Sequence, residues 1–157
     1  MKKLKLYIDT SVWNFLFADD APEKRQDTQR FFDEIESGDY ELFISEMVMI
    51  EIRKAPDAIK NRILTKMSEL EPEELEVTPE IRRLTARYIE AGFLSGKAYE
   101  DLVHAAVATV NNMDFLVSWN PKHIVKVKTI AGINAVNVLE GYRELKICDV
   151  LGVFSDE

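Results

Sequence analysis

The feature that most constrains the fold is the alternation of short apolar segments with longer amphipathic ones. The apolar segments read as strands at 4–9, 41–45, 75–78, 115–119 and 145–148. Helical patterns lie between them: a short one reaching Leu16, then 22–38, 45–55, 56–70, 79–91, 97–112 and 121–140. Such alternation favours a parallel α/β sheet with helices on both faces.

Several residues mark where these helices should begin and end. Pro22 and Pro79 suit first helical positions, and Gly92 is a typical stop. Thr10 or Ser11 is expected to cap the first short helix, and Ser45 the helix after the second strand. Residues 121–140 fit neither period well; we expect mostly helix there, ended by Gly141.

Length, cysteine content and charge limit the class of protein. A chain of 157 residues without a long linker is predicted to form a single domain, 1–157, and no apolar run reaches the ~18 residues that cross a membrane. The lone Cys148 excludes an intramolecular disulfide, so we expect a reducing, cytoplasmic compartment, with Cys148 in a packing role.

The net charge of −8 argues against non-specific binding of nucleic acid over the whole surface. It does not exclude a nucleic-acid enzyme, because carboxylates loaded with divalent cations present positive charge. The acidic block at 69–76 reads as a solvated loop and helix start. Lys122, Lys126 and Lys128 form a local basic patch that either guides RNA or is a plain solvated face.

Polar motifs lie at or just after predicted strand ends, among them the turn Ser118-Trp119-Asn120, and three acids stand out. Asp9 ends the first strand, Glu51 lies on the helix after the second, and Asp101 shares a helix face with Ala105 and Ala108. Sites in parallel sheets lie beyond the carboxyl ends of the strands, and Mg²⁺ and Mn²⁺ prefer such oxygen ligands. Singly, Asp9 is more often a helix cap, and the other two are more often salt-bridge members. No histidine or cysteine cluster has zinc-ligand spacing.

Four segments, 7–12, 44–52, 101–106 and 115–120, resemble the PIN-domain family, and within it the VapC-like toxins of prokaryotic toxin–antitoxin pairs. The resemblance spans residues 4 to about 150. It implies a three-layer α/β/α fold with a mostly parallel sheet and Mg²⁺- or Mn²⁺-dependent cleavage of RNA. Asp9, Glu51 and Asp101 would be the metal ligands, and Ser11 and Ser118 small polar site residues. A protein antitoxin and a homodimer are implied by analogy.

Asn120 departs from the family pattern, which commonly has a fourth acid at this position. An amide oxygen can bind a cation or hold a water on it, but it adds no charge. Three acids should suffice for one metal, whereas a second metal site and a high rate are put in doubt.

Other residues have two readings each. His123, beside Lys122, either contacts a scissile phosphate or donates a proton, or it is a helix-start residue bonded to backbone. His104 reads as a satisfied, partly buried histidine, or as a partner of Asp101 three residues away. Trp13 and Trp119 read as core or rim residues, with base stacking as the alternative.

These observations leave competing functions. The leading one is a metal-dependent endoribonuclease toxin, and the alternative is a PIN-like module that binds RNA or protein with little catalysis. A phosphatase with Asp9 as nucleophile is disfavoured, since Ser11 stands where such enzymes usually need a second aspartate.

Overall fold

A parallel five-stranded sheet forms the centre of the computed structural model, which describes residues 3–94, 98–120 and 124–155. The strand order is β3-β2-β1-β4-β5, and every neighbouring pair is parallel. The strands are β1 (Leu4–Ile8), β2 (Tyr40–Ser45), β3 (Glu73–Leu75), β4 (Phe115–Val117) and β5 (Lys146–Cys148). The predicted parallel sheet is therefore confirmed.

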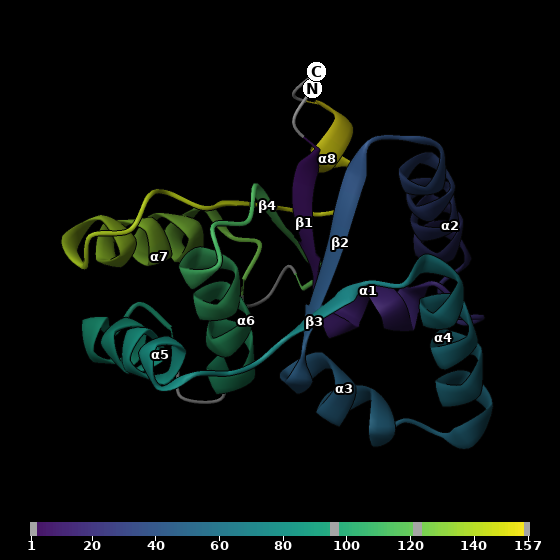
Figure 1. Cartoon of the computed structure of the whole chain (residues 1–157), viewed down its shortest axis with the longest axis horizontal. Coiled ribbons are helices and arrows are strands. Elements are labelled where there is room, and N and C mark those ends of the chain that lie inside the picture. Colours follow the sequence, from purple (N-terminus) through teal and green to yellow (C-terminus); the bar gives the residue numbers. More distant parts are fainter. Residues whose placement is uncertain (1–2, 95–97, 121–123, 156–157) are drawn as a thin grey trace.

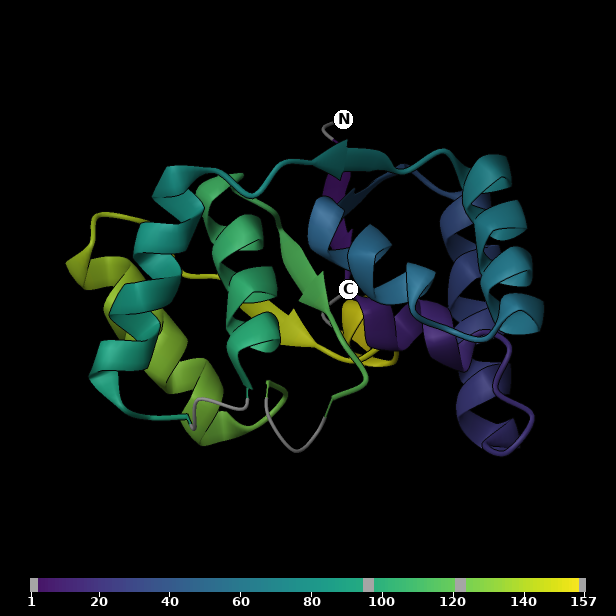
Figure 2. The same cartoon turned by 90° about the horizontal axis from the view of Figure 1, so that it is seen from below.

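Helices cover both faces of this sheet. Figures 1 and 2 show one group on one side, which consists of α1 (Thr10–Phe15), α2 (Pro22–Ser37), α3 (Glu46–Arg53) and α4 (Asp57–Leu70). The other group comprises α5 (Pro79–Ala91), α6 (Tyr99–Val110) and α7 (Val127–Leu139). A short α8 (Gly152–Ser155) follows β5. The result is the expected three-layer α/β/α fold.

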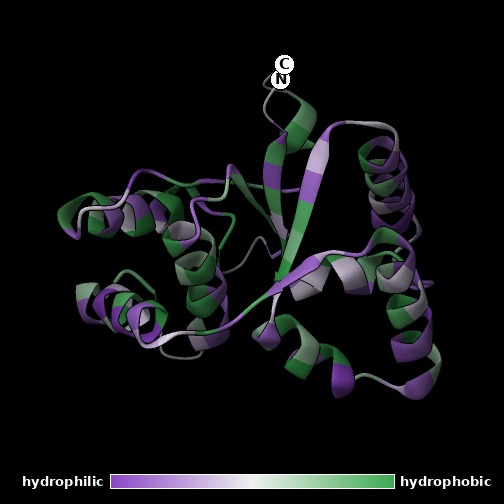
Figure 3. Cartoon of the chain, viewed as in Figure 1, coloured by the Kyte–Doolittle hydropathy of each residue, from purple (hydrophilic) through white to green (hydrophobic). Residues whose placement is uncertain are grey.

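The core lies on both faces of the sheet, between it and the helices that cover it. Leu6, Tyr7 and Ile8 of β1 are fully buried, as a central strand covered on both faces requires. Residues 102–109 of α6 are all buried, and small side chains such as Ala105 and Ala108 let this helix approach the sheet closely. Figure 3 shows α6 as mostly hydrophobic, whereas α5 alternates between polar and apolar residues.

Most helix ends follow the predicted signals. Pro22 and Pro79 open α2 and α5, and the side chain of Thr78 caps α5. Gly92 ends α5 with a φ of 73°, a left-handed conformation that favours glycine. Ser45 precedes α3, but its side chain makes no capping hydrogen bond.

Two predicted elements have other bounds. The strand expected at 75–78 is β3, which lies earlier because Glu73–Leu75 pairs with residues 43–45 of β2. The acidic block therefore covers the end of α4 and β3, not a helix start. The helix expected at 121–140 begins at Val127, because residues 124–126 form a turn and a bend, and it ends at Leu139. Within the described residues, no helix is long and apolar enough to span a membrane.

Candidate active site

The carboxyl edge of the sheet, between β1 and β4, is the natural place for a site. From β1 the chain continues to α1 on one face of the sheet, whereas the helix that follows β4, α7, lies on the other face (Figure 1). Parallel sheets bind ligands at such a reversal, because the connections diverge and leave a crevice. Asp9 follows β1 here, and Ser118 follows β4.

Asp9 is almost fully buried and serves as the N-cap of α1. Its Oδ1 accepts hydrogen bonds from the backbone N–H of Ser11 at 3.0 Å and from the Ser11 hydroxyl at 2.5 Å. The expectation that Thr10 or Ser11 caps this helix was wrong, because the carboxylate of Asp9 is the group that accepts from the backbone N–H of Ser11. The capping role does not compete with a site role, since a cap engages one carboxylate oxygen.

Ser11 and Ser118 join the ends of β1 and β4. The Ser11 hydroxyl oxygen accepts from the backbone N–H of Trp119 at 2.8 Å, and it lies 3.4 Å from the hydroxyl of Ser118. Ser118, which is fully buried, accepts from the backbone N–H of Asn120 at 3.1 Å. The two predicted polar residues therefore position the loop after β4 against Asp9.

Asp101 lies in the first turn of α6, on the other side of this loop. The side-chain amide of Asn120 donates to its Oδ2 at 3.0 Å. An acid there also interacts favourably with the helix dipole, which is the structural alternative for Asp101 and its neighbour Glu100.

Glu51, in α3, turns inward toward α1 and α6. Its Oε1 accepts from the Thr10 hydroxyl at 2.8 Å and lies 2.7 Å from Nε2 of His104. The alternative reading of His104, a pairing with Asp101, thus gives way to a bond with Glu51. The preferred reading, a satisfied histidine, is confirmed, since His104 is 2% exposed and bonded at both ring nitrogens.

Charge and burial shift the titration of the site. Burial raises the pKa of Asp9; His104 and the hydroxyls of Ser11 and Ser118 offset part of this, and the charge of Asp101 adds to it. Burial also acts to raise the pKa of Glu51, but His104, Thr10 and Glu100 together lower it. Burial acts to lower the pKa of His104. The hydrogen bond to Glu51 and the charges of nearby carboxylates outweigh this effect, so the pKa is raised overall. The three predicted acids are therefore electrostatically coupled through His104.

The donor types of this site suit Mg²⁺ or Mn²⁺, since aspartate and glutamate oxygens are their usual protein ligands. As they stand, however, no three His, Cys, Asp or Glu side chains among the described residues are arranged to enclose an ion. Several carboxylate oxygens are instead held by hydrogen bonds to Ser11, Thr10 and Asn120.

The remaining predicted residues divide clearly. Lys122 and His123 lie outside the described residues. Trp13 is a fully buried core residue. Trp119 packs at the rim, where its indole N–H donates to Thr28 at 2.8 Å, and half-buried Cys148 packs against the core.

Sequence reasoning missed four polar residues of the site: Tyr7, Thr10, Ser45 and Glu100. Two of them carried a readable signal, since Tyr7 and Ser45 are polar residues within predicted buried strands. Thr10 and Glu100 adjoin predicted acids, and sequence alone gives them no distinguishing feature.

A hollow of about 830 Å³ adjoins Glu51. It runs along α1 and the start of α4 and is lined by residues that include Phe17, Lys54, Pro56, Ile59 and Arg62. The guanidinium of Arg62 stacks over the ring of Phe17, 4.5 Å from its centroid. This hollow offers an extended molecule a place beside the acids.

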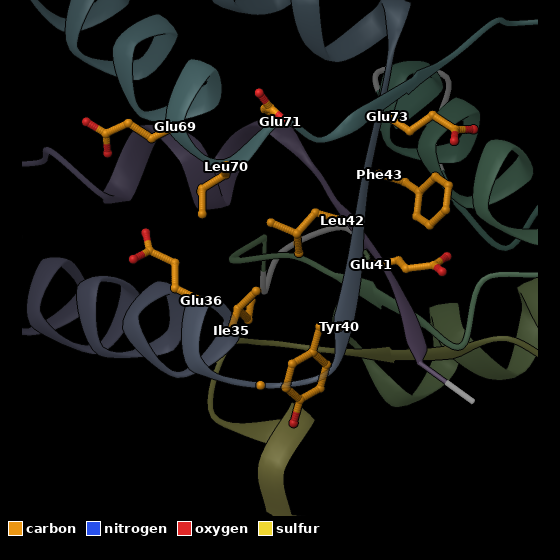
Figure 4. A pocket seen from close by; sticks show the side chains of 11 residues that line it. Ile35, Glu36, Tyr40, Glu41, Leu42, Phe43, Glu69, Leu70, Glu71 and Glu73 are labelled. Atoms are coloured by element: carbon orange, nitrogen blue, oxygen red, sulfur yellow. The ribbon is translucent and has the colours of Figure 1, made fainter. Parts of the chain in front are cut away.

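A second pocket, of about 430 Å³, lies at the opposite, amino end of β2 (Figure 4). Leu42 and Leu70 lie between acidic side chains, which include Glu69 and Glu73 of the acidic block. Because parallel strands share one direction, this pocket is remote from the carboxyl edge and contributes nothing to the site.

Comparison with known proteins decides the family. The family model of the PIN domain matches residues 6–128. The chain belongs to the PIN domain family. The predicted acids at 9, 51 and 101 and Asn120 all lie within the matched part of this PIN domain.

Solved structures agree with this PIN fold at low sequence identity. VapC20 of Mycobacterium tuberculosis, a Sarcin-Ricin loop cleaving toxin, aligns with a TM-score of 0.59 at 12% identity, over 89% of this chain and 98% of that one. VapBC2 from Rickettsia felis, bound to a promoter DNA fragment, aligns at 0.57 and 13%, over 93% and 98%. DNA-bound VapBC from Salmonella typhimurium aligns at 0.53 and 17%, over 94% and 98%. The resemblance to VapC-like PIN domains is thus confirmed at the level of fold. No curated protein gives a significant match to the sequence.

Proposed function

We propose that this PIN domain is a divalent-metal-dependent endoribonuclease, and that it is the toxin of a VapBC-type pair. The proposal is supported by the placement of Asp9, Glu51 and Asp101, which come from three separate segments and whose charges all act on the buried His104. Family membership supports nuclease chemistry, and the fold shared with an RNA-loop-cleaving toxin supports RNA as the substrate.

Asp9, Glu51 and Asp101 are the residues that would hold Mg²⁺ or Mn²⁺. The bound cation supplies positive charge that offsets the phosphate and lowers the pKa of an attacking water. One carboxylate of this set accepts the proton of that water. Asn120 orients Asp101 through its amide, and Ser11 and Ser118 hold the loop that carries Asn120.

The hollow beside Glu51 is the proposed path of the RNA strand. Lys54 and Arg62 supply positive charge in a hollow that acidic side chains also line. Arg62 covers one face of the Phe17 ring, so a base would stack on the guanidinium or on the other face of the ring. Contributions from Lys122 and His123, predicted from the sequence, remain part of this proposal.

The decisive experiment is cleavage of a labelled RNA pool in Mg²⁺, Mn²⁺ or EDTA. We expect cleavage by the wild type that EDTA abolishes, and none by Asp9→Asn or Asp101→Asn. Asp33→Asn, at an exposed position of α2, is the matched control and should cleave like the wild type. Circular dichroism must show that each variant is folded. Unchanged cleavage by both site variants would refute the proposal.

Two observations favour a second function, a PIN-like module that binds RNA or protein without turnover. Asn120 replaces an acid, and the described acids do not enclose an ion as they stand. Tight RNA binding by the folded wild type, without cleavage under either metal, would decide for this function.

The partners belong to the same proposal. Two of the similar structures are VapBC assemblies on DNA, which supports a protein antitoxin as partner. We further propose a homodimer in the cytoplasm. Light scattering of the purified chain, alone and co-expressed with the product of a neighbouring short gene, tests both the dimer and the antitoxin.

A further inference from the structure

A buried chain of polar side chains ends on Glu51. The hydroxyl of Ser45 lies 2.7 Å from the Tyr7 hydroxyl, which lies 2.7 Å from Nδ1 of His104. Nε2 of His104 in turn lies 2.7 Å from Oε1 of Glu51. Ser45 and Tyr7 are fully buried, and His104 is 2% exposed. These hydrogen-bonded side chains therefore join β2, β1 and α6 to the Glu51 carboxylate on α3.

Burying three polar groups in this core gains little stability by itself. Polar groups lose hydration when buried and recover it only through complete hydrogen bonding. The neighbours of Tyr7 along β1, Leu6 and Ile8, are apolar and fully buried on the opposite face of the sheet. What the polar chain adds is a defined orientation for the one group at its end.

Thr10 and His104 bond the same oxygen of Glu51. Thr10 donates to Oε1 at 2.8 Å, and Nε2 of His104 lies 2.7 Å from the same atom. Two partners on one oxygen restrain rotation of a side chain that otherwise loses considerable entropy when it is held in one rotamer. Glu100 contributes a further side-chain hydrogen bond to Glu51, so the carboxylate is held from more than one element.

We propose that His104 is a positioning residue, which holds Oε1 of Glu51 and so fixes the orientation in which this carboxylate would meet a cation, while Tyr7 and Ser45 fix the imidazole ring. This inference rests on the proposed metal-dependent function. Partners of ligands commonly change metal affinity by about 10–100-fold when they are removed. Tyr7 and Ser45 are one and two hydrogen bonds further from Glu51, so their removal should change the metal affinity less.

The test measures Mn²⁺ affinity of the whole chain by electron paramagnetic resonance, beside kcat and KM. His104→Leu should weaken Mn²⁺ binding by about 10–100-fold and lower kcat with little change in KM. His104→Gln, which keeps an N–H donor, should recover most of the loss. Tyr7→Phe should cause a smaller loss.

Tyr88→Phe is the matched control. Tyr88 is also fully buried, and its hydroxyl donates to Asn137 at 2.5 Å in a network remote from Glu51. Its removal should lower Tm as Tyr7→Phe does, but leave Mn²⁺ affinity unchanged.

The outcomes separate the positioning role from the function on which it rests. Wild type that binds Mn²⁺ but cleaves no RNA would reject the ribonuclease, while the Mn²⁺ series still decides the role of His104. Unchanged Mn²⁺ affinity in His104→Leu, no recovery in His104→Gln, or an equal loss in Tyr88→Phe would overturn the positioning role. Absence of Mn²⁺ binding by the wild type would overturn both.

Discussion

The side-chain amide of Asn120 donates a 3.0 Å hydrogen bond to Oδ2 of Asp101, and so joins the loop after β4 to the first turn of α6. A carboxylate at position 120 would instead face Asp101 as a like charge. The amide of Asn120 thus stabilises the site when no cation is bound, but it removes one negative charge that could otherwise help to bind a cation.

Asn120→Asp should therefore make stability dependent on metal. Without a cation, loss of the hydrogen bond and the new repulsion should lower the free energy of unfolding by about 1–3 kcal/mol. Saturating Mn²⁺ should restore it and bind more tightly than to the wild type. Thermal melts with EDTA and with Mn²⁺ measure both effects, and equal melts in EDTA would contradict the argument.

Asp9→Asn should raise Tm while it abolishes cleavage. Burial raises the pKa of Asp9, so ionisation at neutral pH destabilises the fold. Asparagine can still cap α1 through Oδ1 without that charge. The gain, on the order of a few degrees at neutral pH, should shrink as the pH falls through the raised pKa, because Asp9 then becomes neutral in the wild type.

Melts of the wild type and Asp9→Asn from pH 4 to 8, without metal, test this sign. A stabilisation that grew toward low pH would show that Asp9 is stabilised as a carboxylate. Mn²⁺ should raise Tm of the wild type more than that of the variant.

Ser11→Ala should lower kcat for RNA cleavage strongly and the free energy of unfolding only modestly. The substitution removes the hydroxyl that donates to Asp9 and accepts from the N–H of Trp119. Loss of these two bonds removes a link between the ends of β1 and β4. We expect a fall in kcat of about 10-fold or more and a loss of about 1–2 kcal/mol in stability. Ser37→Ala, at an exposed position of α2, is the control and should leave both quantities unchanged.

The hollow beside Glu51 can be tested by its charge. Lys54→Ala and Arg62→Ala should each weaken RNA binding and reduce the slope of log affinity against log salt by about 0.7 for a single-stranded RNA. Filter binding across salt concentrations in an inactive Asp101→Asn background measures the slope. Arg87→Ala, on α5, removes the same charge from the opposite layer, and an equal effect there would place the RNA elsewhere.

Local signals predicted most of the fold. Proline at the start of α2 and α5, glycine after α5 and the apolar runs of β1 and β4 are short-range effects, and all are confirmed. The strand β3 was predicted two residues too late at its start and three at its end, because its position depends on pairing with β2 and not on its own composition. The sheet order likewise depends on contacts between distant segments.

The apolar pattern alone located Asp9 at the carboxyl end of β1, because a strand end is visible as the point where buried apolar residues stop. The sequence also marked position 120 as the place where an amide replaces an acid. Only the tertiary structure decided that His104 bonds Glu51 rather than Asp101, and that Thr10 shares the same oxygen. The physical reason is that a side chain three residues from Asp101 can reach several partners, and packing of α3 and α1 against α6 selects among them. Spacing along the sequence limits which side chains His104 could contact, and the packing of elements distant in sequence decides which of them it bonds.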